Sequence, residues 1–370
     1  MNRRGASAAA RWDVLAEGLY CRSGLRTAPE GATGLNIHTF TKSDIPEAAE
    51  LLAARHLAAR KTHSFLPAEW DQPERWQETL TAALEGASGV VATDGGRTLG
   101  FMLGRRDLTD QRSMGARYGD PRAGFVPFEG HAVAAGADAR RLYTVMYAEL
   151  GAEWVRRGFF SHGIQVFASD RAARDAMVDL GFGHKFVAAF RPAGDPPPAA
   201  EAAGLEVREA SRADEEDVHR LEMELDYYHA TPPMFMPVDA ETEAGARRMQ
   251  ETLYDNPEAA IFLAYREGRA VGMVSMMAPS YMAASLLFPG LVYLYQGIVS
   301  EEARSSGAGE VLLARALRWA AERGHTHVAL HYHAANPTGG PFWRKHGFEA
   351  VQQGMARLVD ERIAWARDWR

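Results

Sequence analysis

The chain of 370 residues contains the same succession of strand, helix and glycine patterns twice, and this repeat constrains its fold more than any other feature. In each half, a capping residue precedes an apolar stripe, apolar runs flank a glycine-containing turn, and a helical pattern ends at a glycine. The alternative is a chance likeness between unrelated α/β segments, but the constant spacing of equivalent residues favours a duplicated unit. Three pairs are each 166 positions apart: Gly158 and Gly324, Gly181 and Gly347, and Asp170 and Asn336.

A proline-rich stretch separates the two copies. Residues 192–204 begin Pro-Ala-Gly-Asp-Pro-Pro-Pro, a composition that suits neither the interior of a helix nor a central strand. We therefore expect a semi-rigid linker at 192–204, a first domain at 35–191, and a second domain with a C-terminal tail at 205–370. Residues 1–34 are expected to form a partly disordered extension, because no apolar core of a signal peptide follows the arginines near the start.

The composition argues against several classes of protein. Hydrophobic residues make up 46% of the chain and charged residues 24%, which is typical of a globular protein. The net charge of −7 argues against a nucleic-acid partner, and no apolar run is long enough to cross a membrane. The single cysteine, Cys21, excludes an intramolecular disulfide, so we expect a cytoplasmic protein. A monomer and a homodimer are both compatible with these numbers.

The segment Arg304–Gly309 has the layout of a backbone cradle for a pyrophosphate. It follows an apolar run at residues 291–299 and opens an amphipathic helical pattern. Glycines allow main-chain N–H groups to approach an anion closely, and the N-terminus of a helix adds partial positive charge. The segment therefore predicts a phosphate-binding loop between a strand and a helix.

The second half resembles the GNAT superfamily of acyl-CoA N-acyltransferases, and the first half resembles a divergent copy, as in tandem-GNAT proteins. The likeness rests on Val299 followed by the Arg304–Gly309 loop, on Asn336 after the next apolar run, and on Phe342 shortly before Gly347-Phe348. The resemblance implies an α/β (α+β) fold with two tandem domains, each a mixed, mostly antiparallel sheet flanked by helices.

The resemblance also implies how acetyl-CoA is held. Backbone groups of Ile298 and Val299 would pair with the pantetheine arm like an added strand. A solvated loop charge remains the alternative for Arg304, and a simple turn remains the alternative for Asn336. The other implied contacts come from the loop, the following strand end and the last helix: Arg304, Ser305, Ser306, Gly307, Ala308, Gly309, Glu310, Asn336 and Phe342.

Three residues are candidates for catalysis: Tyr295, His331 and Trp343. The family often has a tyrosine where this chain has Trp343, and its hydroxyl can protonate the leaving thiolate. An indole N–H has no comparable pKa, so Trp343 either donates a hydrogen bond or is a core residue. Tyr295 either lines the acceptor site or is buried in the core, and the carboxylate that the family often places near it is missing.

Strict alternation along a strand at residues 291–299 places Tyr293, Tyr295 and Gly297 on one face and Gln296 on the other. Gly297 is expected to form the bulge that this family uses to open the cofactor slot.

His331 and His333 lie two positions apart and share a face of the next strand. Either is a candidate base, because an unperturbed imidazole titrates near neutral pH. Hydrogen-bonded structural histidines are the alternative. No third ligand for a metal is evident, so we expect no metal.

The first half departs from the binding pattern, so we expect it to be a scaffold that walls the acceptor site rather than a second acetyl-CoA site. Asp170 and Met177 replace Asn336 and Trp343. The phosphate positions have lost their glycines, since Asp138, Arg141 and Tyr143 stand where the second half has Arg304, Gly307 and Gly309.

The resemblance implies an N-acetyltransferase that transfers an acetyl group from acetyl-CoA to a primary amine of a small-molecule or peptide acceptor. Because no convincing nucleophile is present, we expect direct attack in a ternary complex, without an acyl-enzyme. The alternative is a non-catalytic acyl-CoA-binding sensor or interaction module.

Overall fold

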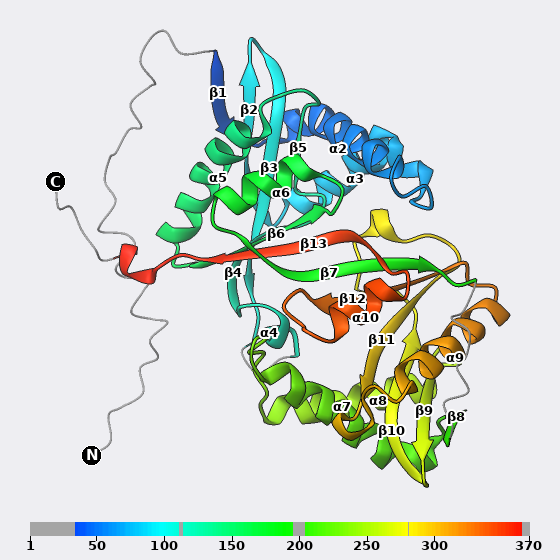
Figure 1. The fold of residues 1–370 in the computed structure, drawn as a ribbon. Helices are drawn as coiled ribbons and strands as arrows, with labels where there is room; N and C mark the ends of the chain where they lie inside the picture. Colours follow the sequence, from blue (N-terminus) through cyan, green and yellow to red (C-terminus); the bar gives the residue numbers. More distant parts are fainter. Residues whose placement is uncertain (1–33, 111–113, 195–203, 280, 365–370) are drawn as a thin grey trace, which may run out of the picture.

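The computed structural model describes residues 34–110, 114–194, 204–279 and 281–364, and its strands form one twisted sheet with helices on both sides (Figure 1). The predicted extension up to residue 33 and the linker residues 195–203 lie outside the described part of the chain. The first half contains, in order, β1 (Leu35–Thr39), α2 (Ile45–Arg60), α3 (Pro73–Leu84), β2 (Ala87–Asp94), β3 (Arg97–Leu108), α4 (Met114–Tyr118), β4 (Arg122–Val126), β5 (His131–Val133), α5 (Ala139–Arg156), β6 (Ser161–Phe167), α6 (Arg171–Asp179) and β7 (Gly183–Pro192).

The second half repeats this order apart from α4 and β5, and this agreement confirms the predicted duplication. Each long helix of the repeat ends at a glycine in the left-handed region, with φ of 76° at Gly158 and 81° at Gly324. Glycine has no Cβ to clash in that conformation, so both stop their helices as predicted. The elements are β8 (Leu205–Glu209), α7 (Glu215–Ala230), α8 (Ala240–Asp255), β9 (Ala260–Arg266), β10 (Arg269–Met277), β11 (Leu291–Val299), α9 (Ala308–Glu322), β12 (His327–His333), α10 (Gly339–Lys345) and β13 (Glu349–Leu358).

The last strand of each half is exchanged with the other half. The sheet order is β1-β2-β3-β4-β6-β13-β7-β12-β11-β10-β9-β8, with β5 paired to β3. Thus β13 lies against β6 of the first half, and β7 lies against β12 of the second, where Val187 is opposite Tyr332. The two exchanged strands run side by side across the middle of the molecule (Figure 1). The two halves therefore share a single continuous sheet.

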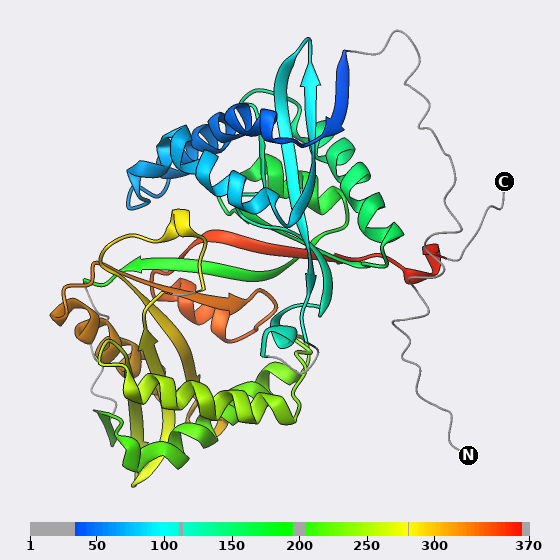
Figure 2. The same ribbon diagram turned by 180° about the vertical axis from the view of Figure 1, so that it is seen from behind.

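The sheet is mixed and mostly antiparallel, as predicted. Among the described strands, only β4 with β6 and β11 with β12 pair in parallel. In the first half, α2 and α3 cover one face and α5 and α6 cover the other (Figures 1 and 2). In the second half, α7 and α8 lie opposite α9 and α10 in the same way.

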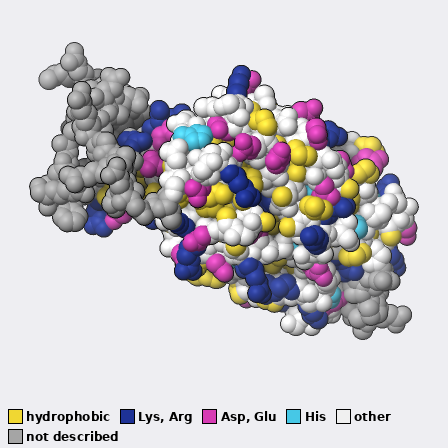
Figure 3. Space-filling model, turned by 90° about the horizontal axis from the view of Figure 1, so that it is seen from above, with side chains coloured by type: hydrophobic (Ala, Val, Ile, Leu, Met, Phe, Trp, Pro, Cys, Tyr) yellow, Lys and Arg dark blue, Asp and Glu magenta, His cyan; other side chains and the backbone are white. Residues whose placement is uncertain are grey.

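The hydrophobic core is shared between the two halves. On the face covered by α7, Leu221 is fully buried in the same cluster as Phe128 and Phe167 of the first half. Burying a large apolar side chain contributes about 1.5–3 kcal/mol, so this shared cluster fixes how the halves pack. On the face seen in Figure 3, acidic and basic side chains are interspersed. Within the described residues, no helix has the length and apolar character to span a bilayer.

Candidate functional site between two diverging strands

Strands β11 and β12 pair only at their beginnings. Residues Leu291–Tyr293 are opposite His327–Ala329, and no further pairing between the two strands occurs in the described structure. Beyond Tyr293, β12 continues to pair with β7 and β11 continues to pair with β10. The edge of β11 that faces β12 is therefore open toward its end, where Ile298 and Val299 lie. An extended chain can add to such an edge through main-chain hydrogen bonds.

A bulge in β11 lies at Tyr295. Ser275 of β10 is opposite Gln296, and Met276 is opposite Leu294, so Tyr295 is the extra residue. The predicted bulge at Gly297 is wrong, because Gly297 pairs regularly with Val274.

The bulge also changes which side chains share a face of β11. Gln296 donates a hydrogen bond to Glu222 of α7, and Tyr295 packs into the core on that same side. Gly297 faces the opposite side, toward Trp343 of α10. The prediction that Gln296 lies opposite Tyr295 is therefore wrong, because strict alternation does not hold across a bulge.

Trp343 packs directly beneath β11. A Cβ built on Gly297 would lie 3.1 Å from two atoms of the indole ring, so any larger residue would require the ring to move by a few tenths of an ångström. Trp343 is buried, and its ring contacts Phe342 and Phe348. This packing agrees with the core role considered for it.

Gly297→Ala is expected to lower the free energy of unfolding by about 1–3 kcal/mol, because the added methyl group overpacks against Trp343. Urea denaturation measures the change. Gly86→Ala is the matched control, since a Cβ there would meet nothing within 4 Å. Equal effects of the two substitutions would contradict the packing argument.

The loop before α9 presents free main-chain donors. Ser305 and Gly307 have φ of 64° and 86°, and no side chain caps the N-terminus of α9. The first N–H groups of a helix have no intrahelical acceptors, so those of Ala308 and Gly309 remain available to an anion, whereas the Glu310 carboxylate accepts from its own main-chain N–H. In addition, the hydroxyl oxygen of Ser306 is buried without a hydrogen-bond partner. These features fit a pyrophosphate.

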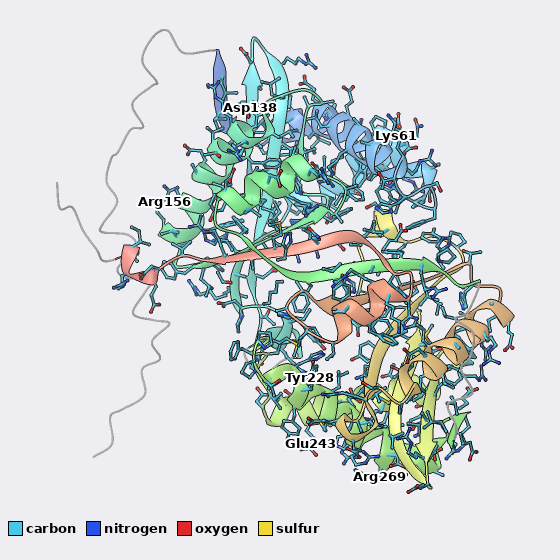
Figure 4. The ribbon with its side chains drawn as sticks, viewed as in Figure 1. Lys61, Asp138, Arg156, Tyr228, Glu243 and Arg269 are labelled. Atoms are coloured by element: carbon cyan, nitrogen blue, oxygen red, sulfur yellow. The ribbon has the colours of Figure 1, made fainter. Side chains whose placement is uncertain are left out.

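The side chains around the loop are held in place by neighbouring elements. The guanidinium of Arg304 lies 4.8 Å from the centre of the Tyr228 ring, and the Tyr228 hydroxyl is 2.8 Å from that of Thr338. Figure 4 labels Tyr228 near the end of α7. The Oδ1 atom of Asn336 accepts from the main-chain N–H groups of Thr338 (3.0 Å) and Gly339 (2.8 Å). Asn336 therefore orders the start of α10 through Oδ1, and its Nδ2 group makes no hydrogen bond within the described residues, so it can donate to a ligand.

The loop is bordered by α10. A Cβ on Gly309 would lie 3.2 Å from the Phe342 ring, so Phe342 covers the first turn of α9. Lys345 donates to Glu310 across 3.2 Å, which ties the same turn to α10. Ala308 is buried below.

The corresponding space in the first half is filled by side chains. At the spacing of 166, His131 stands at the position of Gly297, and Tyr143 at that of Gly309. The Tyr143 hydroxyl donates to Nδ1 of His131 (2.7 Å), and Nε2 of His131 donates to the Gln165 carbonyl (2.9 Å). Burial and a nearby arginine lower the pKa of His131 to about 3, so the ring is neutral. This network closes the gap that stays open between β11 and β12.

The N-terminus of α5 is also closed to anions. Asp138 accepts a hydrogen bond from the main-chain N–H of Arg141 (3.1 Å), so its carboxylate occupies the place a phosphate would take (Figure 4). A pocket of about 330 Å³ lies beside this helix end. Asp94 and Asp138 line it together with Arg97 and Arg141, so its lining offers a pyrophosphate no net positive charge.

The structure places a carboxylate near Tyr295, although the sequence showed none there. It belongs to Glu222 of α7, which is hydrogen-bonded to the adjacent Gln296. Both oxygens of Glu222 accept from amides, one from Gln250 (2.6 Å) and one from Gln296 (2.7 Å). Glu222 is 2% exposed, and burial raises its pKa to about 7. The sequence signal was a charged residue on the apolar stripe of α7, between Leu221 and Leu225.

The first half reaches this site through α4. Arg117 forms an ion pair with Asp226 (2.6 Å), and the two residues are 6% and 5% exposed. The Nε and Nη2 atoms of Arg117 are buried without a hydrogen-bond partner. Neither residue was expected to act here, because they are far apart in the sequence.

The predicted candidates Tyr295 and His331 border the same region. The Tyr293 hydroxyl is 2.9 Å from Nδ1 of His331, and burial lowers the pKa of His331 to about 4. Burial also raises the pKa of Tyr295, whose ring stacks on that of Tyr281 at 6.0 Å. In the described residues, no group of three or more His, Cys, Asp or Glu is placed to hold a metal ion.

Comparisons with known proteins agree with this geometry. The family model described as acetyltransferase (GNAT) family matches residues 222–348, from Glu222 to the last buried phenylalanine after α10. No curated protein matches the chain.

Several solved structures match most of this chain in fold but are distant from it in sequence. A GCN5-related N-acetyltransferase from Sphaerobacter thermophilus is 18% identical, with a TM-score of 0.54 over 90% of this chain and 97% of that chain. A GCN5-related glucosamine N-acetyltransferase region of a fungal multi-domain GH3 beta-N-acetylglucosaminidase is 10% identical, with a TM-score of 0.50 over 88% and 38%. A tandem GNAT protein from the clavulanic acid biosynthesis pathway is 14% identical, with a TM-score of 0.47 over 88% and 99%. The Sphaerobacter and fungal structures, with TM-scores of 0.54 and 0.50, establish the fold of this chain and nothing beyond it.

Proposed function

We propose that this chain transfers an acetyl group from acetyl-CoA to a primary amine of a small-molecule or peptide acceptor, because the acetyltransferase (GNAT) family model matches residues 222–348. The observation that carries the proposal is the open edge of β11, which leads to the uncapped N-terminus of α9. The edge suits the pantetheine arm, and the helix terminus suits the pyrophosphate.

The reaction requires a neutral amine next to the thioester. The amine nitrogen bonds to the carbonyl carbon, the carbon–sulfur bond breaks, and the thiolate of CoA leaves. Main-chain N–H groups at Ile298 or Val299 are the candidate donors to the carbonyl oxygen as it gains charge. Trp343 packs against the face of β11 opposite Tyr295 and Glu222, so its role here is to support the strand.

Glu222 is the best-placed group to take the proton from the amine. Its pKa of about 7 suits a base that works near neutral pH. His331, with a pKa of about 4, is a weaker base. Tyr295 lines the acceptor side of the open edge, close to Glu222.

Release of free CoA thiol on addition of amines tests the proposal. We expect acetyl-CoA to be stable with the protein alone and to be consumed when a suitable amine is added, with one acetylated amine formed per thiol. Tight binding of acetyl-CoA without turnover across a broad amine panel would instead support a non-catalytic acyl-CoA sensor.

The pH dependence of the rate tests the role of Glu222. Because the carboxyl must lose its proton to act, kcat/KM should rise through pH 7 in the native protein. Glu222→Gln should lower kcat by about 100- to 10,000-fold and remove that rise. Acetyl-CoA affinity should stay unchanged, and a variant that keeps the rise would exclude Glu222 as the base.

The same group makes a second prediction, on stability. The pKa of Glu222 is raised by folding, so the folded state binds more protons than the unfolded state between the ordinary value of 4.5 and about 7. Glu222 therefore destabilises the fold increasingly as pH rises through this window. The free energy of unfolding of Glu222→Gln minus that of the native protein should therefore be larger at pH 8 than at pH 5. Urea denaturation at the two pH values measures this difference.

A further inference from the structure

Three tyrosines, Tyr281, Tyr293 and Tyr295, form an aromatic wall beside the open edge of β11. The Tyr281 ring is 5.8 Å from Tyr293 and 6.0 Å from Tyr295, nearly parallel to the latter. Tyr118 of α4 lies beside Arg117, whose guanidinium is 5.8 Å from the centre of the Tyr118 ring. Tyr118 and Tyr281 are 46% and 50% exposed, whereas the other two lie deeper. The exposed aromatic surface of Tyr118 and Tyr281 suits a flat apolar or aromatic substituent.

Glu222 lies close to this wall, and the only cation that acts on it within the described residues is Arg117, which is too far away for an ion pair. Its two hydrogen-bond partners are neutral amides, and no ion pair includes it among the described residues. A buried carboxylate without a cation is costly unless a ligand supplies one. An ammonium group would supply that charge, and the neighbouring aromatic rings also favour a cation.

Arg117 is a buried cation that lacks acceptors for part of its guanidinium group. Its Nη1 atom is on Asp226, which lies one helical turn after Glu222 on the same side of α7. Its Nε and Nη2 atoms, the edge that binds a carboxylate in two parallel hydrogen bonds, are buried and unpartnered. A buried guanidinium edge without an acceptor is costly in the same way.

We propose that the acceptor is an aromatic amino acid, held with its ammonium group at Glu222, its carboxylate on the free edge of Arg117, and its ring against Tyr118 and Tyr281. The inference rests on the proposed acetyl transfer and narrows its acceptor. It also gives the first half a direct role, because α4 supplies both the carboxylate-binding group and part of the exposed aromatic surface.

Three ligands that differ by one group test the inference on the full chain saturated with CoA. Calorimetric titration should give a dissociation constant for L-phenylalanine about tenfold lower than for phenethylamine, which lacks the carboxylate, or 3-phenylpropanoate, which lacks the amine. Equal affinity of phenylalanine and phenethylamine, or binding of none of the three, would overturn the inference.

Arg117→Lys separates recognition from folding. Lysine keeps the charge next to Asp226 but has no planar two-donor edge, so the variant should fold and bind phenethylamine normally. The preference for phenylalanine should fall to about equal affinity, and an unchanged preference would overturn the inference. Tyr118→Ala should weaken phenylalanine binding about tenfold, with CoA binding unchanged.

Prior titration with CoA separates the two levels of the proposal. If the native protein does not bind CoA, the proposed acetyl transfer itself is contradicted. Normal CoA binding without the expected ligand preference would contradict only the assignment of the acceptor.

Discussion

Gly307→Glu is expected to weaken acetyl-CoA binding by about 100-fold or more, because like charges in contact cost several kcal/mol and 1.4 kcal/mol corresponds to a factor of ten. Gly307 is the N-cap of α9 and has φ of 86°, so its substituent lies next to the free N–H groups of the helix. The glutamate would bring negative charge and bulk to the place proposed for the pyrophosphate. Calorimetric titration with acetyl-CoA measures the loss.

Two variants control for the backbone strain that any side chain adds at this position. Gly136 has φ of 79° and precedes the helix of the first half, so Gly136→Glu introduces the same residue in the same conformation. It should leave acetyl-CoA affinity unchanged. Gly307→Asn should retain most of the affinity, because asparagine tolerates the left-handed region and is neutral. A similar loss for Gly307→Glu and Gly136→Glu would contradict the assignment of the loop.

Arg117→Ala is expected to lower the free energy of unfolding by about 3–5 kcal/mol, because it leaves Asp226 buried and unpaired. Burial already raises the pKa of Asp226, and the ion pair with Arg117 opposes that rise. The pair joins α4 of the first half to α7 of the second, so its loss should weaken contact between the halves.

Chemical denaturation at pH 7 measures this effect, and the double variant Arg117→Ala with Asp226→Ala is the control. Removing both charges leaves no unpaired ion, so the double variant should be more stable than Arg117→Ala alone. If the two variants are equally unstable, the ion pair is not the source of the loss.

Local features of the fold were predictable from the sequence, but the pairing of distant strands was not. The helix stops at Gly158 and Gly324 depend on backbone conformation within a few residues, so the pattern identifies them. The exchange of β7 and β13 depends on which of two similar strand edges each one meets. Both edges offer the same main-chain hydrogen bonds, and the choice is made by contacts between residues more than 130 positions apart, such as Val187 with Tyr332.

The site residues likewise divide into those that a local motif predicts and those that depend on contacts between distant residues. The loop at Arg304–Gly309 is a local motif, and the structure gives it an uncapped helix terminus that fits the prediction. Glu222 was missed because its hydrogen bond with Gln296 spans 74 residues. Gln296 was assigned to the wrong face, because one extra residue at Tyr295 reverses the alternation that follows it.

The central claim is that the chain holds one acetyl-CoA site, formed by the second half, while His131 and Tyr143 close its counterpart in the first. The stoichiometry of acetyl-CoA binding to the native protein, measured by calorimetric titration, tests it most directly. We predict a single site per chain that is lost in Gly307→Glu. Two sites per chain, or a single site that survives that substitution, would contradict the claim.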